Sequence, residues 1–250
     1  MLRLITDFDG PVMDVSERYY RVYRYCLERL SDPDGPPLRV LSKAEFWDCK
    51  RAQVPERKIG RLSGLDEARS LEFARLRRET VHTLPYLVHD APVPGAVAAL
   101  DRAQALGWDL VVMTMRRVRE LDDAFERCDL GRFFPAASRY CLADDYVKTR
   151  DVDDKPKLMA RAIGELSPAA ATWMVGDTEA DIAAARAGGI PIISVLSGIR
   201  DRDRLAAHQP DAIVDNLEAA IDFILARRAV GGGLPQTVTS PVQPLQSSVG

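Results

Sequence analysis

Five short apolar runs, each ending in polar residues, constrain the fold of this 250-residue chain more than any other feature. They are LRLIT (2–6), DLVVMT (109–114), ATWMVGD (171–177), PIISVLSG (191–198) and DAIVD (211–215). Continuous runs of Val, Ile and Leu are typical of strands covered on both faces, as in a parallel sheet. Helical patterns precede three of the runs, at 94–107, 155–166 and 180–189, and each closes near a glycine suited to a helix C-terminus. This alternation predicts an α/β fold with a doubly wound, Rossmann-like parallel sheet.

Two regions interrupt the alternation. The first has no strong strand pattern but contains helical stretches such as 16–30, and Ser42 with Glu45 fits a capping box at the start of another helix. The second, at the C-terminus, is uncharged and rich in Gly, Pro, Ser, Thr and Gln, which is typical of a flexible tail. The predicted organisation is an α/β core at 1–13 and 92–228, a helical insertion at 14–91 and a flexible tail at 229–250.

Composition and charge exclude several classes of protein. With 46% hydrophobic and 28% charged residues, the chain is expected to be soluble and globular. A net charge of −3 provides no basic field, so nucleic acid is not an expected partner. The first residues, MLRLITDFDG, become acidic too soon to fit a signal peptide, and no apolar stretch reaches about 18 residues, so a cytoplasmic protein without a membrane segment is expected. The cysteines at 26, 49, 128 and 141 form no CxxC pair and indicate neither a zinc site nor a disulfide framework.

Polar residues follow the predicted strands at the edge where open α/β sheets bind ligands. Asp7 and Asp9 come after the first run, Thr114 ends the second and Asp177 ends the third. Lys155 stands before a predicted helix. Two carboxylates separated by one residue repel each other unless a cation lies between them. The cluster therefore predicts a metal site, for which the alternative is a plain polar turn after the first strand.

Together these residues resemble the motifs of the haloacid dehalogenase superfamily of hydrolases, over about residues 2–225. DFDGPVMD fits the first motif, Thr114 the second, Lys155 within DDKPK the third and GDTEADIAAARAGG the fourth. The layout is most similar to phosphoglycolate phosphatase-like members, which carry a helical cap inserted after the first motif. The resemblance implies that residues 14–91 are this cap and that the chain is a phosphoric monoester hydrolase. Its expected partner is a small phosphorylated metabolite.

The resemblance also implies how the two aspartates of the first motif act. Asp7 would be the nucleophile that forms an aspartyl-phosphate, and Asp9 would give a proton to the leaving group and recover it. Mg²⁺ would be held by Asp7, the backbone carbonyl of Asp9 and Asp177. A hard divalent cation with oxygen ligands neutralises the repulsion between a carboxylate nucleophile and a phosphate dianion.

Further implied roles concern the phosphate. Thr114 and the backbone amide that follows it would donate to the phosphoryl oxygens, and Lys155 would compensate the negative charge. The expected substrate-binding residues are Gly10, Met115 and Arg116, with Arg116 directed at a phosphate or a substrate carboxylate.

Asp181 lies four residues after Asp177 and would orient Lys155 or a metal-bound water. Its alternative is an exposed acid that stabilises a helix N-terminus. Pro11 departs from the Thr or Val usual at this position in the family and removes one backbone donor from the loop. The scattered histidines at 82, 89 and 208 match none of the motifs and are assigned to packing or to the surface.

Three functions remain open on the sequence. Asp9 argues against the dehalogenases and phosphonate hydrolases of the superfamily, which lack this second aspartate. A phosphatase is the leading reading, and a phosphomutase similar to β-phosphoglucomutase would use the same pair of aspartates. A phosphate-binding protein without catalysis would keep the fold, but the complete set of motif residues argues against it. The sequence leaves the oligomeric state open.

Overall fold

A computed structural model, which describes residues 1–230, contains a parallel sheet in the order β5-β4-β1-β6-β7-β8. The strands are β1 (Leu2–Thr6), β4 (Asp109–Arg117), β5 (Arg139–Leu142), β6 (Ala171–Gly176), β7 (Ile192–Val195) and β8 (Ala212–Val214). The chain starts at β1 in the middle, adds β4 and β5 on one side, and then crosses back to add β6, β7 and β8 on the other. The predicted doubly wound sheet is confirmed, and its switch point lies between β1 and β6.

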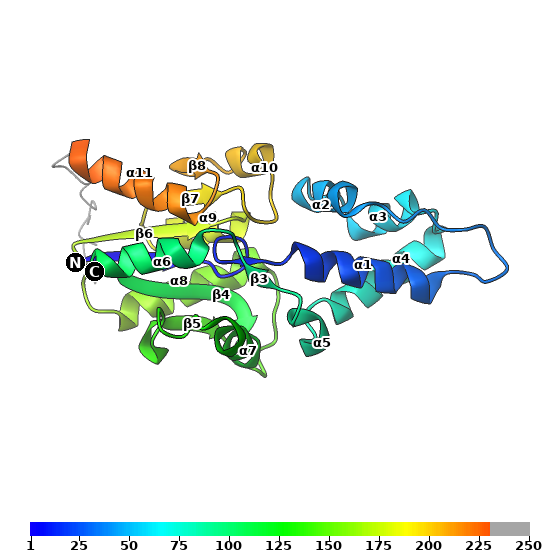
Figure 1. The fold of residues 1–250 in the computed structure, drawn as a ribbon, viewed down its shortest axis with the longest axis horizontal. Coiled ribbons are helices and arrows are strands. Elements are labelled where there is room, and N and C mark those ends of the chain that lie inside the picture. The colour runs from blue at the N-terminus through cyan, green and yellow to red at the C-terminus, as the bar shows by residue number, and fades with distance from the viewer. Residues whose placement is uncertain (231–250) are drawn as a thin grey trace, which may run out of the picture.

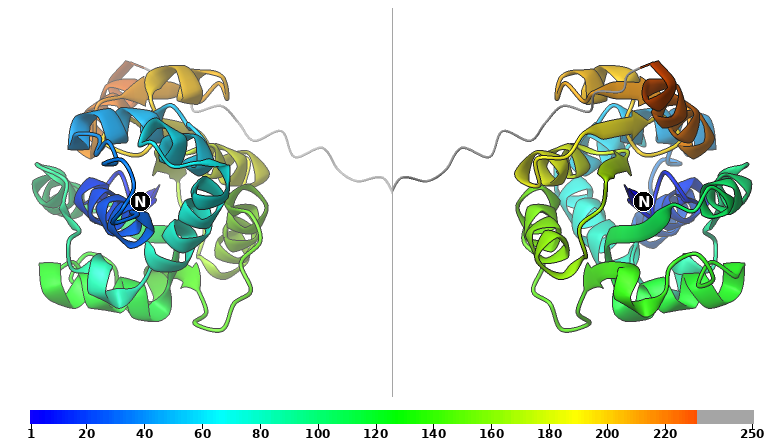
Figure 2. Two further views of the ribbon diagram at one scale, coloured as in Figure 1. Left: turned by 90° about the vertical axis from the view of Figure 1, so that its right-hand side faces the viewer. Right: turned by 90° about the vertical axis from the view of Figure 1, so that its left-hand side faces the viewer.

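Helices cover both faces of the sheet (Figure 2). One face packs against α6 (Ala96–Ala105), α7 (Val118–Cys128) and α11 (Leu217–Val230), and the other against α8 (Asp151–Glu165), α9 (Glu179–Ala187) and α10 (Arg202–Ala206). Successive strand residues point to opposite faces, so Leu4 joins the first layer and Ile5 the second. Burial on both sides explains why these strands are apolar without alternation.

A helical segment lies beyond the carboxyl ends of the strands (Figure 1). It consists of α1 (Ser16–Leu30), α2 (Lys43–Arg51), α3 (Glu56–Leu62), α4 (Glu67–Thr80) and α5 (Leu84–Leu87). These helices enclose a hydrophobic cluster of their own, in which the rings of Tyr23 and Phe46 stack 4.7 Å apart. The predicted capping box of Ser42 and Glu45 is present at the start of α2. Two antiparallel strands, β2 (Met13–Asp14) and β3 (Ala91–Pro92), join the segment to the sheet.

The structure corrects three details of the sequence prediction. Strand β5 was not expected, because it is short and only its alternate residues are buried. Strand β4 continues through a bulge to Arg117, so Thr114 lies within the strand instead of at its end. Helix α8 begins at Asp151, which places Lys155 inside the helix and not before it, and Gly164 lies within the same helix instead of ending it. The acidic residues Asp151, Asp153 and Asp154 in the first turn of α8 suit a helix N-terminus and explain the earlier start.

The C-terminal end of the described chain is helical. Helix α11 includes Ala229 and Val230, and residues 231–250, where most of the flexible tail was predicted, lie outside the described residues. Within residues 1–230, no helix combines the length and the apolar character needed to cross a membrane.

A buried carboxylate ties the loop before α8 to the helix. Asp154 accepts hydrogen bonds from the hydroxyl groups of Tyr146 and Thr149 (both 3.0 Å), from the Thr149 amide (2.8 Å) and from Lys157 Nζ (2.9 Å). These bonds, that from Lys157 foremost, hold the pKa of Asp154 well below its usual range. The loop they fix carries Lys148, which reaches the cavity described below.

We expect Asp154→Asn to lower the free energy of unfolding by about 1 to 3 kcal/mol at pH 7, because an amide cannot accept from all four donors. The folded-state pKa of Asp154 is depressed, so its contribution is complete above the unfolded pKa of about 4 and is lost as pH falls toward the folded pKa. In urea unfolding between pH 7 and pH 3, the difference in unfolding free energy between Asp154→Asn and wild type should therefore shrink as the pH falls. Asp222→Asn, at an exposed ion pair, is the control, and a difference that does not vary with pH would contradict this role.

Candidate active site

A cavity of about 110 Å³ lies where the carboxyl ends of β1, β4 and β6 face the helical segment. Seven of the residues predicted for the site line this cavity, namely Asp7, Asp9, Thr114, Met115, Arg116, Lys155 and Asp177. Parallel strands present their carboxyl ends at one edge of the sheet, so residues more than a hundred positions apart in sequence meet here. The structure thus brings these seven predicted residues together, whereas Gly10 and Asp181 do not line the cavity.

Asp7 and Lys155 form a buried ion pair at the centre of the cavity. Lys155 Nζ lies 2.8 Å from Asp7 Oδ2 and 2.5 Å from Asp181 Oδ1. The other oxygen of Asp7 accepts a hydrogen bond from the Phe8 amide at 2.7 Å. Burial opposes the charged form of Lys155, but the carboxylates of Asp181 and Asp7 outweigh it and raise its pKa. The lysine therefore stays a cation beside the Asp7 carboxylate.

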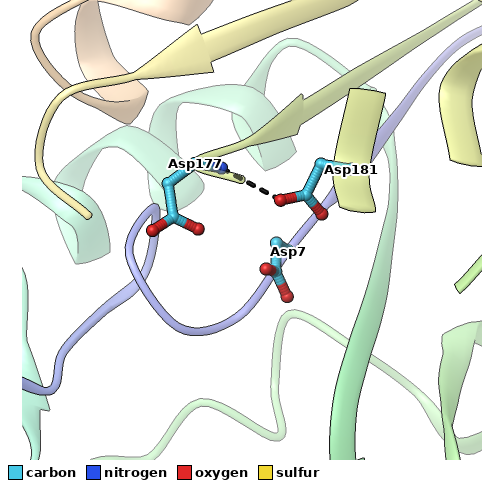
Figure 3. A group of neighbouring side chains, drawn as sticks. All are labelled: Asp7, Asp177 and Asp181. Carbon is cyan, nitrogen blue, oxygen red and sulfur yellow. Dashed lines mark hydrogen bonds between the residues drawn. The ribbon is translucent and has the colours of Figure 1, made fainter. Parts of the chain in front are cut away.

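Asp177 and Asp181 complete a group of three buried carboxylates (Figure 3). Asp177 follows β6, and Asp181 lies in the first turn of α9, where it forms a capping box with Thr178. Asp181 Oδ2 accepts from the amides of Asp177 (3.1 Å) and Thr178 (2.9 Å) and from the Thr178 hydroxyl (2.7 Å). Its other oxygen is occupied by Lys155, so Asp181 both caps its helix and holds the lysine.

The three carboxylates offer a set of oxygens that suits a hard divalent cation. One oxygen from each of Asp7, Asp177 and Asp181 lies within 4.8 Å of the others. Burial and the Asp181 carboxylate raise the pKa of Asp7 well above its usual range and that of Asp177 to about 7. Like charges brought this close are stabilised when a cation lies between them. Asp181 accepts three hydrogen bonds on one oxygen and does not line the cavity, whereas Asp7 and Asp177 do, so these two are the side chains best placed to bind a metal.

Glycines allow the chain to pass close to Asp177. Gly10 has a φ of 96°, and a β-carbon at this position would overlap the Asp177 carboxyl group. A β-carbon at Gly198 would overlap the same side chain. The Ile199 amide then donates to Asp177 Oδ2 at 2.6 Å. Gly10 thus shapes the acidic group, and it is not among the residues that line the cavity.

Thr114 and Met115 line the cavity from strand β4. Thr114 is buried, and its hydroxyl accepts a hydrogen bond from the Arg116 amide at 3.2 Å. That bond leaves the hydroxyl proton of Thr114 free to be donated into the cavity.

Asp9 is held by two arginines from different parts of the chain. Arg116 contacts Asp9 Oδ1 through Nε (2.8 Å) and Nη2 (2.6 Å), and Arg18 Nη2 contacts Asp9 Oδ2 at 3.0 Å. Both arginines also pair with Asp90, at 3.0 Å between Arg18 Nε and Asp90 Oδ1 and through Arg116 Nη2 to Asp90 Oδ2. Among the described residues, Arg116 Nη1 has no hydrogen-bond partner.

The charges of these four side chains balance at neutral pH. Burial disfavours the ionised form of Asp9, but Arg116 and Arg18 outweigh it and lower the pKa of this carboxyl to about 2. Burial raises the pKa of Asp90 to about 6, which still leaves it ionised at pH 7. Two carboxylates thus face two guanidinium groups.

Several residues that the sequence analysis missed belong to this region. His82, assigned there to packing or surface, and Tyr19 line the cavity from the helical segment, and Lys148 lines it from the loop before α8. Arg18 carried a signal, because it stands four residues before Val22 on the buried face of α1, where a charge needs a partner. Asp90 carried none, since its partners lie far away in sequence.

The helical segment also meets the sheet region at a second place. Gln53, in the loop between α2 and α3, donates to Glu179 Oε1 at 3.0 Å, and Arg200 pairs with Glu179 at 2.8 Å. The Asp201 amide donates to the Arg51 carbonyl at 3.1 Å. The cavity is therefore bounded by the helical segment on both sides.

Comparisons with known proteins agree with this geometry. A family model described as HAD-hydrolase-like matches residues 154–220, which include Lys155, Asp177 and Asp181. "Probable phosphatase IndB" of Dickeya dadantii is 30% identical over 226 residues, which cover 87% of this chain and 91% of that protein. A phosphoglycolate phosphatase of Pseudomonas syringae is 24% identical over 225 residues, covering 87% of this chain and 78% of the relative.

The fold is also found among solved structures. A haloacid dehalogenase-like family hydrolase from Streptococcus pneumoniae superposes with a TM-score of 0.61 at 18% identity, covering 89% of this chain and 97% of that one. At such low identity the likeness concerns the fold alone. The match to the Dickeya protein along nearly its whole length carries the assignment further. This chain belongs to the haloacid dehalogenase-like hydrolases, and it is a phosphatase of that superfamily.

Proposed function

We propose that the protein is a Mg²⁺-dependent phosphatase that hydrolyses a small phosphorylated metabolite through an aspartyl-phosphate on Asp7. The observation that carries the proposal is the position of the Asp7 carboxylate. It lies in the cavity, 2.8 Å from the Lys155 ammonium and within the group of three carboxylates. A carboxylate held beside fixed positive charge is suited to attack the phosphorus of a phosphoryl group whose oxygens carry negative charge.

In the first half-reaction, an oxygen of Asp7 bonds to phosphorus while the bond from phosphorus to the leaving oxygen breaks. Lys155 is positioned to offset the charge of nucleophile and phosphate, and the Thr114 hydroxyl, with the amide of Met115, to donate to phosphoryl oxygens. In the second half-reaction, water attacks phosphorus and the bond to Asp7 breaks, which releases inorganic phosphate.

Asp9 is proposed to move the proton in both half-reactions. It gives a proton to the leaving oxygen and then takes one from the attacking water. The two arginines favour its ionised form, which suits the second half-reaction. A phosphate dianion that enters the cavity adds negative charge beside Asp9 and so favours the protonated form needed for the first.

Mg²⁺ would be held by Asp7, Asp177 and the backbone carbonyl of Asp9. The oxygen donors and the mutual repulsion of the carboxylates support this choice. When bound, the cation supplies positive charge that neutralises the phosphate and the nucleophile. Asp181 is proposed to orient Lys155, since its oxygens already have partners.

The volume of the cavity supports a small substrate. About 110 Å³ is well below the roughly 300 to 1,000 Å³ of pockets that hold drug-sized ligands. The name of the Pseudomonas relatives points in the same direction, since phosphoglycolate is a small phosphate ester. A phosphomutase would instead return the phosphoryl group to the substrate, and product analysis separates the two.

We propose further that the helices of residues 14–91 act as a cap over this cavity and that residues 1–13 and 92–228 form the core. The separate hydrophobic cluster of the helices and their contacts on both sides of the cavity support this division. A cap that closes over the site would keep bulk water out during the first transfer.

Asp7→Asn should abolish phosphate release, with a loss on the order of a thousandfold or more, because the nucleophile is gone. A screen of sugar phosphates, phosphoglycolate, nucleotides and amino-acid phosphates, with and without Mg²⁺, identifies the substrate to use. Rapid acid quench with a ³²P-labelled substrate should label wild type but not the variant.

Asp7→Asn should unfold at the wild-type temperature or above it, since it removes one of three like charges. Asp109→Asn, which breaks the pair with Arg3 at the opposite end of the sheet, is the matched control and should keep full activity. Unchanged activity in Asp7→Asn would refute the assignment of the nucleophile, and isomerised product without phosphate would select the mutase.

Removal of divalent cations with EDTA should stop phosphate release, and Mg²⁺ should restore it. Because a ligand that binds only the folded state stabilises it, Mg²⁺ should also raise the melting temperature of the wild type without substrate. Asp177→Asn should lose this thermal shift, whereas Asp109→Asn should keep it. A shift that persists in Asp177→Asn would place the cation elsewhere.

A further inference from the structure

Four buried charged side chains connect the reaction loop to the helical segment. We call Asp9, Arg18, Asp90 and Arg116 the charge tetrad. Arg18 belongs to α1, Asp90 stands directly before β3 where the chain returns to the sheet, and Arg116 belongs to β4. The tetrad therefore joins both crossings between the helical segment and the sheet to the loop that follows β1.

Within the tetrad each arginine bridges the same two carboxylates. Arg18 uses Nε for Asp90 and Nη2 for Asp9, each at 3.0 Å. Arg116 uses Nη2 for both carboxylates and adds a bond of 2.8 Å from Nε to Asp9. A guanidinium is a planar, rigid fork, so fixing one of its nitrogens fixes the direction of the others. The ion pairs with Asp90 thus help to set the direction in which both arginines meet Asp9, together with the Val81 carbonyl and His82 beside Arg18 Nη1.

Asp90 itself is out of reach of the cavity. Its side chain and that of Arg18 are 0% exposed and neither lines the cavity, whereas the side chain of Asp9 is 27% exposed and does. Asp90 can therefore affect the reaction only through the arginines. It also supplies the second negative charge, without which two buried guanidinium groups would face a single carboxylate.

We propose that Asp90 is a positioning residue that, through Arg18 and Arg116, orients the Asp9 carboxylate toward the leaving group. This inference rests on the proposed function, because it assigns Asp90 to the step in which Asp9 protonates the leaving oxygen. It differs from a purely structural role in one respect. Loss of Asp90 should matter most for substrates whose leaving group needs that proton.

The test compares two substrates in wild type and in Asp90→Asn. The leaving group of an alkyl phosphate such as 2-phosphoglycolate is an alkoxide, which needs a proton. The leaving group of p-nitrophenyl phosphate is the stable p-nitrophenolate, which does not. We expect kcat/KM for the alkyl phosphate to fall about tenfold to a hundredfold and kcat/KM for the aryl phosphate to fall less than about threefold, because kcat/KM reports the first half-reaction, in which the leaving group departs, and not the later hydrolysis that both substrates share. Asp9→Asn should show the same selectivity more strongly.

Two further variants test whether the effect of Asp90→Asn comes from positioning or from a general loss of stability. Arg18→Lys keeps the charge, but its single nitrogen cannot hold Asp90 and Asp9 together, so it should show the same selectivity and can replace Asp90→Asn if that variant does not fold. Asp109→Asn, at the opposite end of the sheet, should leave both rates unchanged. Thermal melts with and without Mg²⁺ establish that each variant is folded at the assay temperature.

The outcomes separate this inference from the function on which it depends. Equal losses for both substrates in folded Asp90→Asn and Arg18→Lys would overturn the positioning role and leave the phosphatase assignment intact. Absence of phosphate release by the wild type from every substrate would overturn the proposed function and this inference with it. A loss confined to the alkyl phosphate in Asp90→Asn and Arg18→Lys supports it.

Discussion

Repulsion among three buried carboxylates is the constraint on which the site depends. Asp7, Asp177 and Asp181 arrive from the ends of two neighbouring strands and the first turn of a helix, and their oxygens come within 4.8 Å of one another. Lys155, from a third element, offsets part of this charge and ties two of the three together. The switch point of the sheet lies between the strands that carry them, so the topology itself creates the crowding that makes a cation useful there.

In a second group of charged side chains, the chain itself supplies the positive charge that compensates buried carboxylates. Around Asp9 the compensating charges are arginines of the chain itself, and the tetrad is neutral without any ligand. The two groups meet in the loop after β1, where Asp7 and Asp9 are two residues apart. One aspartate faces a site that gains from an added cation, and the other faces a site that is already balanced. Adjacent carboxylates thus have different protonation behaviour, as different roles in one reaction require.

The sequence predicted the sheet, the helical insertion and the motif residues that line the cavity, but not Tyr19, His82 or Lys148, which line it from other segments. These features depend on local periodicity and on the rule that ligands bind at the carboxyl ends of parallel strands. It did not predict β5, because four residues with only two of them fully buried give too weak a pattern. It also missed the link from Asp9 to Asp90 through the two arginines, because 80 residues lie between the two aspartates and only tertiary structure shows where the chain returns. Arg18 on an apolar helix face was the single local clue.

The two glycines beside Asp177 show how unevenly the chain can tolerate change. Gly10 and Gly198 are far apart in sequence, yet each leaves space for the same Asp177 side chain. A larger residue at either position would displace that side chain, and the other position has no side chain that could be shortened to compensate. The demand for glycine at these two positions therefore comes from Asp177 and not from the substrate, whereas the cavity walls contributed by the helical segment meet no such demand. Relatives with different specificities would be expected to share the glycines and to differ in the helices.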